Sequence, residues 1–514
     1  MRKFKKIISI ILSVSFLLIL LLSGCNGENK KDTTSNATNS AEQNSNTGFL
    51  YPNLEPVKLN WYYMSLHQPD EQMVFEELNK IIKSKLNATV DFRPMEFAEY
   101  EDKMKLILSS GESFDLCFTS WWGGVKYYDA IQRGSFLELD ELVEKYGQTA
   151  RNTVPEKIWN AARYKDGKLY GIVNYQVSVY TKGLWVRKDL AEKYKNEFDV
   201  TNIKKYTDIE PFFKLIKEKE PGYTPCLMTR KGWYDQMSFT LGLLPVYSVA
   251  GVSLEEPRKI IFGDKRPEFR EYLETVRRWY LNGYIRKDVI SIKDDEPEIK
   301  SGKYAVGIAS NIKPGGASDW AIKNGYEVIE IPLGRSIIDT NSCIATLTAI
   351  SKTSQNPERA MMLIDLFYSD KKLYNTMAFG IEGIHYKKVS ETRMEPLAKE
   401  RYYPSNTQWQ FGTQFNAYLN PDQADNVWEE TKRLNETAAE SPVNGFVVDT
   451  KPIRREAILI SAAAAEFESI KGTGTVDPDE VLTKYLEKLD RAGADKVIEE
   501  VQRQYDEWLR AHNK

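Results

Sequence analysis

Histidine and cysteine are scarce in this 514-residue chain, which contains three His and four Cys. His67, His385 and His512 lie far apart, and none has a partner at the helical i, i+4 spacing that a zinc site would use. No Gly-x-Ser-x-Gly elbow, His-Glu-x-x-His pair or P-loop occurs. We therefore expect no metal, no cofactor and little imidazole chemistry.

Net positive charge is also lacking, because the chain has 70 basic and 73 acidic residues, which gives a formal charge of −3. Such a balance gives no basic field for nucleic acid. Tyr and Trp are abundant instead, with 29 and 11 residues. A hydrophobic fraction of 42% and a charged fraction of 28% exclude collagen, coiled coil and wholesale disorder. At about 100–200 residues per domain, the length predicts two to four domains.

The N-terminus has the pattern of a secretory signal. Two basic pairs, Arg2-Lys3 and Lys5-Lys6, precede an apolar run from Ile7 to Leu22, which is shorter than the roughly 20 residues that span a bilayer. The residues at the end of this apolar run, Leu22-Ser23-Gly24-Cys25, resemble the bacterial lipobox, in which the Cys is acylated. We expect residues 1–24 to be a signal peptide and Cys25 to carry palmitate or a similar acyl chain. A plain signal peptide or an anchor helix with a chance Cys is the alternative.

After removal of residues 1–24, the chain would have 66 basic and 73 acidic residues. Because such a net acidic chain is not attracted to anionic lipid, its attachment to the outer face of the cell membrane would depend on the lipid on Cys25. Residues 26–48 are polar with almost nothing apolar, which predicts that 25–48 is a disordered tether. The folded body should begin near Phe49 or Leu50. Its three cysteines, Cys117, Cys226 and Cys343, are expected to be buried and free, although one disulfide would be possible.

Strands and helices alternate along the body. Strands are predicted at 56–63, 88–93 and 114–119, with helices at 70–86 and 97–109 between them. This order predicts a parallel sheet, in which ligands bind beyond the carboxyl ends of the strands. The loops after Tyr63 and Thr119 are therefore the first places to look for a site. Further strands are predicted at 168–173, 177–187, 304–309, 326–331 and 345–350, and helices at 127–133, 208–219, 267–282, 357–368, 480–489 and 495–512. Asn356-Pro357-Glu358 predicts the start of the helix at 357–368, with an Asn cap and Pro at the first position. The helix at 495–512 carries an apolar stripe that is expected to face the core.

Several stretches resemble the extracellular solute-binding lipoproteins of bacterial ABC importers (family 1, maltose-binding-protein-like, in the LipO-like lipoprotein branch). Residues 111–116 running into Trp121-Trp122 resemble the family's third strand and ligand loop. Residues 132–139 resemble the turn that follows, and 351–369 resemble the crossing helix. Residues 379–386 and the stretch from Ala494 onward are similar to the lipoprotein branch. The resemblance covers about residues 50–510.

The resemblance implies an α/β, two-lobe, periplasmic-binding-protein-like fold (type II), in which each lobe is a parallel-rich sheet flanked by helices and the ligand cleft lies at the hinge. By this pattern 50–178 with 341–385 form the first lobe, and 179–340 with 386–514 form the second. It also implies a function: an extracellular, lipid-anchored and monomeric protein captures a sugar, above all an oligosaccharide, and delivers it to the permease subunits of an ABC importer. No catalysis and no nucleic-acid partner are expected.

Aromatic rings stack on the C–H faces of sugars, while amides and hydroxyls bond the sugar hydroxyls. Residues of these types at the expected strand ends and crossings are the predicted ligand contacts: Tyr63, Ser65, His67, Trp121, Trp122, Asn174, Tyr175, Gln176, Trp233, Asn311 and Trp409. Each could instead serve packing or lie on the surface. Trp121 and Trp122 are the sharpest candidates, because two adjacent Trp before Gly-Gly cannot both face a core from a strand. Other Trp are expected to serve packing: Trp61, Trp159, Trp185, Trp279, Trp320, Trp428 and Trp508.

Other function classes remain open from the residues alone. A glycoside hydrolase or lyase would need two carboxylates about 5–9.5 Å apart across the scissile bond. A peptide receptor could also use an aromatic cleft, and an adhesive surface lipoprotein would need no open cleft. The sequence does not identify the sugar, its linkage, its charge or the permease.

Overall fold

The computed structural model describes residues 51, 54–238, 240–403 and 408–512. The expected signal peptide (1–24), the lipidated Cys25 and the tether (25–48) lie outside the described residues. The described residues belong to one compact unit. In this part of the chain, no helix combines the length and apolar character needed to cross a membrane.

The first sheet is built on three parallel strands in the order β2-β1-β3, continued by the antiparallel β14 and then β5, with β4 beside β3. Buried residues alternate along the start of β1, with Leu59 and Trp61 in the core, as the sequence pattern predicts. Because β1, β2 and β3 are parallel, their carboxyl ends meet at one edge. The strands are β1 (Val57–Met64), β2 (Ala88–Met95), β3 (Leu116–Ser120), β4 (Val125–Lys126), β5 (Ile172–Val173) and β14 (Leu347–Ile350).

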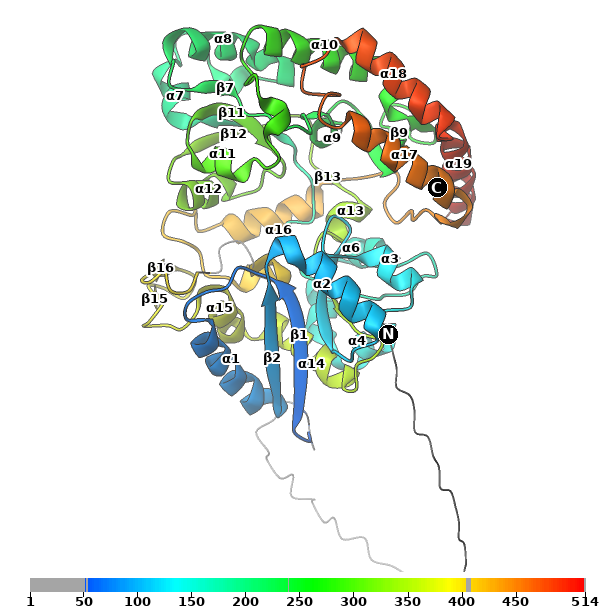
Figure 1. Cartoon of the computed structure of the whole chain (residues 1–514). Helices are drawn as coiled ribbons and strands as arrows, with labels where there is room; N and C mark the ends of the chain where they lie inside the picture. Colours follow the sequence, from blue (N-terminus) through cyan, green and yellow to red (C-terminus); the bar gives the residue numbers. More distant parts are fainter. Residues whose placement is uncertain (1–50, 52–53, 239, 404–407, 513–514) are drawn as a thin grey trace, which may run out of the picture. The chain divides into compact units, whose positions relative to one another are not determined.

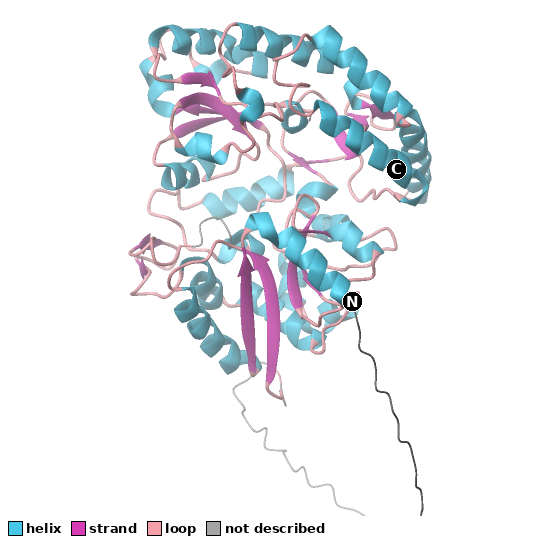
Figure 2. Ribbon diagram, viewed as in Figure 1, coloured by secondary structure: helices cyan, strands magenta, loops and turns pink. Residues whose placement is uncertain are grey.

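Helices cover this sheet (Figures 1 and 2). α1 packs against β2 and α14, whereas α2 packs against β1 and β4. The predicted start of α14 at Asn356-Pro357-Glu358 is confirmed, since Asn356 is its N-cap and Pro357 its first residue. The helices of this part are α1 (Glu71–Leu86), α2 (Phe97–Ser110), α3 (Tyr127–Gln132), α4 (Asp140–Tyr146), α5 (Gln148–Thr153), α6 (Glu156–Ala162), α13 (Thr340–Cys343), α14 (Pro357–Ser369) and α15 (Lys371–Phe379).

The second sheet has the order β12-β6-β11-β7 and is mixed, because β6 is antiparallel to both neighbours and only β7 and β11 are parallel. The expected parallel-rich character therefore holds for the first sheet better than for the second. Its strands are β6 (Gly183–Arg187), β7 (Thr224–Cys226), β11 (Tyr304–Ala309) and β12 (Val328–Pro332). Its helices are α7 (Lys188–Lys193), α8 (Glu210–Lys219), α9 (Tyr234–Met237), α10 (Pro267–Leu281), α11 (Glu296–Lys300) and α12 (Gly316–Asn324).

The strand predicted at 177–187 is shorter than expected, because only Gly183–Arg187 belongs to β6. The residues before it form a crossing segment, 174–182, whose backbone bonds to several distant parts of the chain. Asn174 N–H donates to Thr346 O (2.9 Å), and Tyr180 exchanges two backbone hydrogen bonds with Ile337 (2.8 and 3.0 Å). This segment therefore joins the two sheets without being a ladder strand itself.

The C-terminal part adds a small antiparallel sheet and long helices. α19 packs against β9 and β10, and its predicted apolar stripe is buried, including Val497, Val501 and Tyr505. The remaining elements are β8 (Leu243–Tyr247), β9 (Ala250–Ser253), β10 (Ile260–Phe262), β13 (Ile337–Ile338), β15 (Tyr386–Lys388), β16 (Met394–Pro396), β17 (Ala439–Glu440), α16 (Val427–Thr437), α17 (Arg454–Phe467), α18 (Pro478–Arg491) and α19 (Ala494–Ala511).

Each large sheet has its own hydrophobic core. The first core takes side chains from 59–179 and 338–386, and the second takes side chains from 184–337 and 443–509. The segment from Tyr386 to Tyr418, which the sequence assigns to the second lobe, contributes its buried aromatic residues to the first core. Tyr402 and Phe411 pack there because their partners, including the Met377 carbonyl and Trp61, belong to that core. Cys117, Cys226 and Cys343 are buried and free, as expected.

Candidate functional site

A tight turn at the carboxyl end of β3 exposes two adjacent tryptophans. Ser120 Oγ accepts from Gly123 N–H (3.1 Å) and donates to Gly123 O (2.6 Å), which closes the turn. Gly124 has a φ of +66°, and a Cβ there would lie 3.1 Å from the Tyr100 ring, so glycine is required. Trp121 and Trp122 at the tip of this turn are 39% and 42% exposed, although every residue of β3 is buried.

Trp122 is part of an aromatic cluster. Its ring centroid lies 6.1 Å from that of Trp409 and 6.2 Å from that of Phe118, and the rings of Phe118 and Trp409 are 5.6 Å apart. The indole N–H of Trp122 donates to Ala345 O (2.8 Å), which satisfies its polar atom and orients the ring. Trp409 and Trp122 thus come together from positions almost 290 residues apart. We call the set Trp121, Trp122 and Trp409 the tryptophan platform.

A hydrogen bond to the crossing segment fixes the position of Trp121. Its Nε1–H donates to the Tyr180 hydroxyl (3.1 Å), and the Lys182 ammonium lies 4.6 Å from the centroid of the Tyr180 ring. Burial lowers the pKa of Lys182 to about 8, an effect that the nearby Asp339 carboxylate partly opposes. Burial in turn raises the pKa of Asp339. The half-buried Lys182 amine therefore lies over the ring of Tyr180, the residue that bonds Trp121. Among the described residues, no carboxylate forms an ion pair with this amine.

The ends of the second sheet meet the same crossing segment. Asn311, just after β11, accepts from Thr181 N–H through Oδ1 (3.5 Å), and Ile312 N–H donates to Thr181 O (2.8 Å). Ser310 is exposed and donates through Oγ to Gln236 Oε1 (2.8 Å). These amides and hydroxyls are the hydrogen-bonding groups that a polyhydroxylated ligand could use on this side.

A second titratable group lies on β12. Burial raises the pKa of Glu330 to about 7, and the nearby Asp319 carboxylate adds to the shift while Lys313 opposes it. Lys313 and Asp319 form an ion pair (3.3 Å), and Gln423 Nε2 donates to Asp319 (2.8 Å). Within the described residues, no group of three or more His, Cys, Asp or Glu is placed to hold a metal ion.

The other residues predicted as ligand contacts lie in varied surroundings. Tyr63, Ser65, Asn174 and Tyr175 are buried: Tyr63 packs on Phe411, Ser65 donates to Leu66 O, Asn174 accepts from Thr348 and Tyr175 packs on Phe415. Gln176 is half-buried and donates to Thr346 Oγ1 (3.3 Å). His67 is exposed and bonds Glu71 (3.0 Å).

Trp233 is the clearest departure from the expected site. It is 2% exposed, its Nε1–H donates to Leu227 O (2.9 Å), and its backbone N–H donates to the Tyr272 hydroxyl (2.7 Å). The residue is a core residue of the second sheet, and the prediction that it contacts ligand is not supported by its position. The packing roles predicted for Trp61, Trp159, Trp185 and Trp279 agree with exposures of 0–1%.

The sequence did not identify Tyr180, Lys182, Gln236 or Ser310. Tyr180 and Lys182 lay inside the strand predicted at 177–187. Aromatic and polar side chains are common on the faces of a strand, so the pattern did not mark these two residues as part of a site. Their only local signal is their position just before a strand, at the end of a crossing. Ser310 could have been found with Asn311, because both follow β11 directly.

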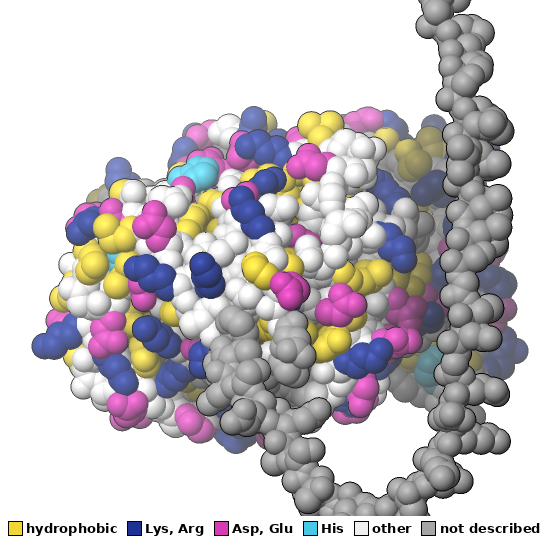
Figure 3. All heavy atoms as spheres, turned by 90° about the horizontal axis from the view of Figure 1, so that it is seen from below, with side chains coloured by type: hydrophobic (Ala, Val, Ile, Leu, Met, Phe, Trp, Pro, Cys, Tyr) yellow, Lys and Arg dark blue, Asp and Glu magenta, His cyan; other side chains and the backbone are white. Residues whose placement is uncertain are grey.

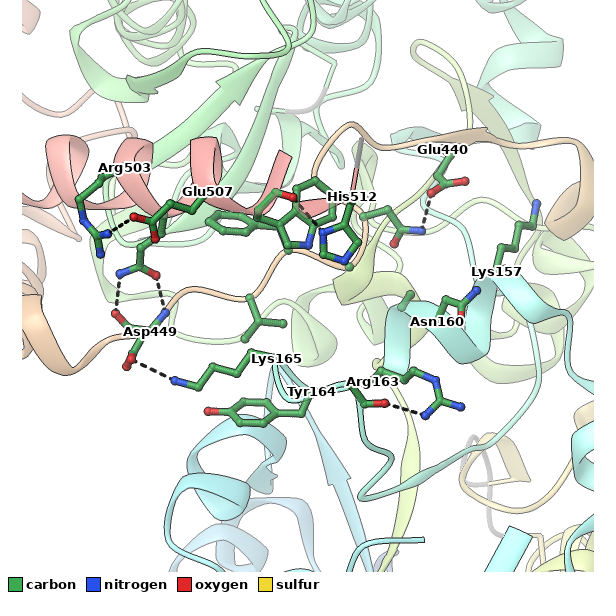
Figure 4. Close-up of a pocket in the computed structure, with 18 of the residues that line it drawn as sticks. Lys157, Asn160, Arg163, Tyr164, Lys165, Glu440, Asp449, Arg503, Glu507 and His512 are labelled. Atoms are coloured by element: carbon green, nitrogen blue, oxygen red, sulfur yellow. Dashed lines mark hydrogen bonds and ion pairs between the residues drawn. The ribbon is translucent and has the colours of Figure 1, made fainter. Parts of the chain in front are cut away.

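A cavity of about 660 Å³ lies elsewhere in the molecule (Figure 4). It is lined from α6 and the following loop, from residues 440–452, and from the last turns of α19. None of the eleven predicted contact residues lines it. The cavity therefore shares no residue with the tryptophan platform.

Charge does not single out a patch on the face seen in Figure 3. On the face seen in Figure 3, basic and acidic side chains are interspersed, with apolar side chains between them. This agrees with the near balance of 70 basic and 73 acidic residues. The platform is thus suited to stacking and hydrogen bonding rather than to capture by a large field.

Comparison with known proteins gives two family matches. The profile described as "Bacterial extracellular solute-binding protein" matches residues 68–372, more than half of the chain. A domain of unknown function, DUF3502, matches residues 442–510. A "Carbohydrate ABC transporter substrate-binding protein" of Streptococcus pneumoniae serotype 4 is 28% identical over 443 residues, which cover 84% of this chain and 87% of that protein.

Solved structures agree with this match. The crystal structure of the N-glycan transport solute-binding protein NgtS from Streptococcus pneumoniae is similar with a TM-score of 0.78 and 26% identity, covering 89% of this chain and 99% of that chain. The same protein in complex with Man5GlcNAc is similar with a TM-score of 0.72 and 26% identity, at the same coverage.

Proposed function

Because the chain belongs to the family of bacterial extracellular solute-binding proteins, we propose that it captures an oligosaccharide and delivers it to an ABC-type membrane importer. The observation that carries the proposal is the tryptophan platform at the end of β3. Trp121 and Trp122 are partly exposed to solvent while both indole N–H groups are bonded to protein. An aromatic surface whose polar atoms are already satisfied is suited to the C–H face of a sugar ring.

We further propose that the two sheets belong to two lobes that close around the ligand. The crossing segment 174–182 connects the sheets, and Trp121 is bonded to Tyr180 on that segment. Hinge closure needs a ligand that binds the closed state better than the open one. A sugar on Trp121 that also bonds Asn311 or Ser310 would contact groups of both sheets and would meet that condition.

An N-glycan fragment is the first ligand to test, since the solved relative binds Man5GlcNAc. Titration calorimetry of the chain with Man5GlcNAc should show saturable binding, and product analysis after prolonged incubation should recover the sugar unchanged. Cleavage of the sugar would favour the alternative of a carbohydrate-active enzyme. Binding of peptides but no saccharide would favour a peptide receptor.

We also propose that Cys25 is lipidated and holds a monomeric receptor at the extracellular face of the membrane. The support is the Leu22-Ser23-Gly24-Cys25 sequence after a 16-residue apolar run, followed by a polar tether. Cells that express the chain should incorporate labelled palmitate into it and retain it in the membrane fraction. The Cys25→Ala variant should carry no label, and the proposal would be wrong if that variant were labelled equally.

A further inference from the structure

β2 forms one open edge of the first sheet, and a side chain of α1 occupies the middle of that edge. Among the described strands, β2 pairs only with β1, and α1 lies beside it (Figure 1). Asn79 of α1 accepts from Val90 N–H through Oδ1 (2.6 Å) and donates through Nδ2 to Val90 O (3.0 Å). We propose that Asn79 blocks this edge against strand pairing with a second copy of the chain. The inference goes beyond the proposed function, which concerns the capture of a ligand by a single chain.

The ladder between β1 and β2 shows which backbone groups of β2 face outward. At its start, Val57 N–H donates to Asn87 O (3.2 Å), and at its end Ser65 N–H donates to Met95 O (2.9 Å). The register between these ends is unbroken. Because backbone groups of successive residues point to opposite sides of a strand, the odd-numbered residues from 87 to 95 bond to β1. The even-numbered residues therefore direct their N–H and C=O groups away from the sheet: Ala88, Val90, Phe92 and Pro94.

Pro94 limits where a second copy could pair with this edge. Proline has no N–H and therefore interrupts a ladder. An antiparallel pairing of two β2 strands that avoids Pro94 places Val90 opposite Val90 and Ala88 opposite Phe92. Val90 then lies at the centre of the pairing. Asn79 covers both backbone groups of that central residue, so an incoming strand would have to displace the amide.

The charged side chains of β2 do not oppose this pairing. In the same register Asp91 lies opposite Thr89 of the second copy, and Arg93 lies opposite Asn87, so like charges do not meet. A groove of about 500 Å³ follows the edge between α1 and β2, and residues of both elements line it, including Asn79. The groove gives space for an incoming strand. Because both copies would use the same edge, the pairing would close as a two-fold dimer.

Asparagine is chemically suited to this position. Its amide carries a donor and an acceptor side by side, which match the C=O and N–H of a single residue. Asn79 lies in the interior of α1, where Asn is a poorer helix former than Ala, and its two bonds to Val90 offset that cost. An open edge is a template for association unless a charge, a proline or a covering group blocks it. Copies tethered to one membrane through Cys25 would meet at high local concentration, which makes such a block more important.

The test removes the amide and measures self-association of the full chain. Asn79→Ala frees both backbone groups of Val90 and keeps a good helix former in α1. In sedimentation velocity at rising concentration, this variant should form a dimer with an association constant at least about tenfold above that of the wild type. Hydrogen exchange read by mass spectrometry locates the contact. The peptide that contains Val90 should exchange faster than in the wild type in dilute solution, and its exchange should slow as the dimer forms.

Two control variants separate edge pairing from a general loosening of α1. Gln72→Ala removes an exposed amide that lines the same groove from the same helix but makes no hydrogen bond to the described part of the chain. This variant should remain monomeric. Asn79→Lys also loses the acceptor for Val90 N–H, but it places an ammonium at the edge. Two such charges would meet at the centre of the dimer, so this variant should remain monomeric as well.

Three outcomes would overturn the proposal. Asn79→Ala could stay monomeric at every concentration, its dimer could show no slowed exchange in residues 88–92, or Asn79→Lys could associate equally well. If Asn79→Ala does not fold, Asn79→Ser gives the same test with the same outcomes, because its short hydroxyl cannot bond both backbone groups of Val90. None of these measurements involves a sugar, so their result does not depend on the ligand of the receptor.

Discussion

The Nε1–H of Trp121 donates to the hydroxyl of Tyr180 across 3.1 Å and joins the end of β3 to the segment that crosses between the two sheets. Tyr180 itself pairs through its backbone with Ile337, the first residue of β13. The orientation of one platform ring thus depends on the connection between the sheets. A ligand stacked on Trp121 is coupled to that connection through a single hydrogen bond.

Removal of either exposed ring should weaken ligand binding. Trp121→Ala and Trp122→Ala are each expected to raise the Kd for Man5GlcNAc about 5- to 150-fold, or about 1–3 kcal/mol, because each loses a pre-oriented stacking surface. Titration calorimetry measures the effect. Trp428→Phe is the control, since Trp428 packs on Phe415 outside the platform. An unchanged Kd in both alanine variants would remove the platform from the binding site.

Tyr180→Phe should show how much the hydrogen bond that orients the Trp121 ring contributes to ligand binding, because the Trp121 ring itself is kept. The variant keeps the ring under Lys182 but removes the acceptor of the Trp121 indole. The free energy of unfolding in urea should fall by no more than about 0.5–1.5 kcal/mol, since the exposed indole can bond water. Binding should weaken severalfold because the Trp121 ring is no longer held. Tyr146→Phe, whose ring packs on Tyr51 away from the platform, should change neither quantity.

Lys182 should make stability depend on alkaline pH. Burial holds its pKa near 8 in the folded chain, below the value of about 10.4 in an unfolded one. Between these values the unfolded state binds the extra proton, so stability rises with pH through this window, and the penalty is fully present below pH 8. Lys182→Met should therefore raise Tm at pH 7, and its advantage over the wild type should shrink from pH 8 to pH 10.

Lys204→Met provides the comparison for that experiment, because the Lys204 side chain is exposed. Its Tm difference from the wild type should stay flat over the same range. A Lys182→Met difference that is equally flat would show that the amine is not buried in solution.

Gly183 should tolerate no side chain. A Cβ at this position would lie 2.0 Å from Ile331 O and 2.8 Å from Ile312 Cδ1, at the point where β6 enters the second sheet. Gly183→Ala should lower the free energy of unfolding by about 3 kcal/mol or more, because the β6–β12 ladder must shift. Gly222→Ala is the matched control, since its Cβ would meet nothing within 4 Å. Urea denaturation of both variants tests the difference.

Local patterns predicted much of the first sheet and its helices. The alternation of apolar residues from Leu59, the Asn-Pro-Glu start of α14 and the apolar stripe of α19 depend on neighbours within a few residues, and all three agree with the structure. The shortened β6 shows the limit of this reasoning. Val177 and Val179 continue an alternating pattern before β6, but the backbone of Tyr180 pairs with the distant Ile337 and makes that stretch a crossing.

The same limit applies to the site. Adjacent Trp before Gly-Gly at a strand end predicted the exposure of Trp121 and Trp122, because no strand geometry buries both. Trp233 has a similar local setting, yet it is buried, because the Leu227 carbonyl and the Tyr272 hydroxyl take up its N–H groups. Nothing near Trp233 in the sequence marks those partners.

By itself, the sequence determined the secretory pattern of the N-terminus, the alternation of strands and helices, and the resemblance to solute-binding lipoproteins. Each of these depends on residue types at short spacing. Only the tertiary structure decided which aromatic residues are exposed, brought Trp409 beside Trp122, and packed the segment after Tyr386 into the first core. It alone assembled the cavity between Tyr164 and Trp508. Burial depends on partners hundreds of residues away, and their positions are fixed only when the chain has folded.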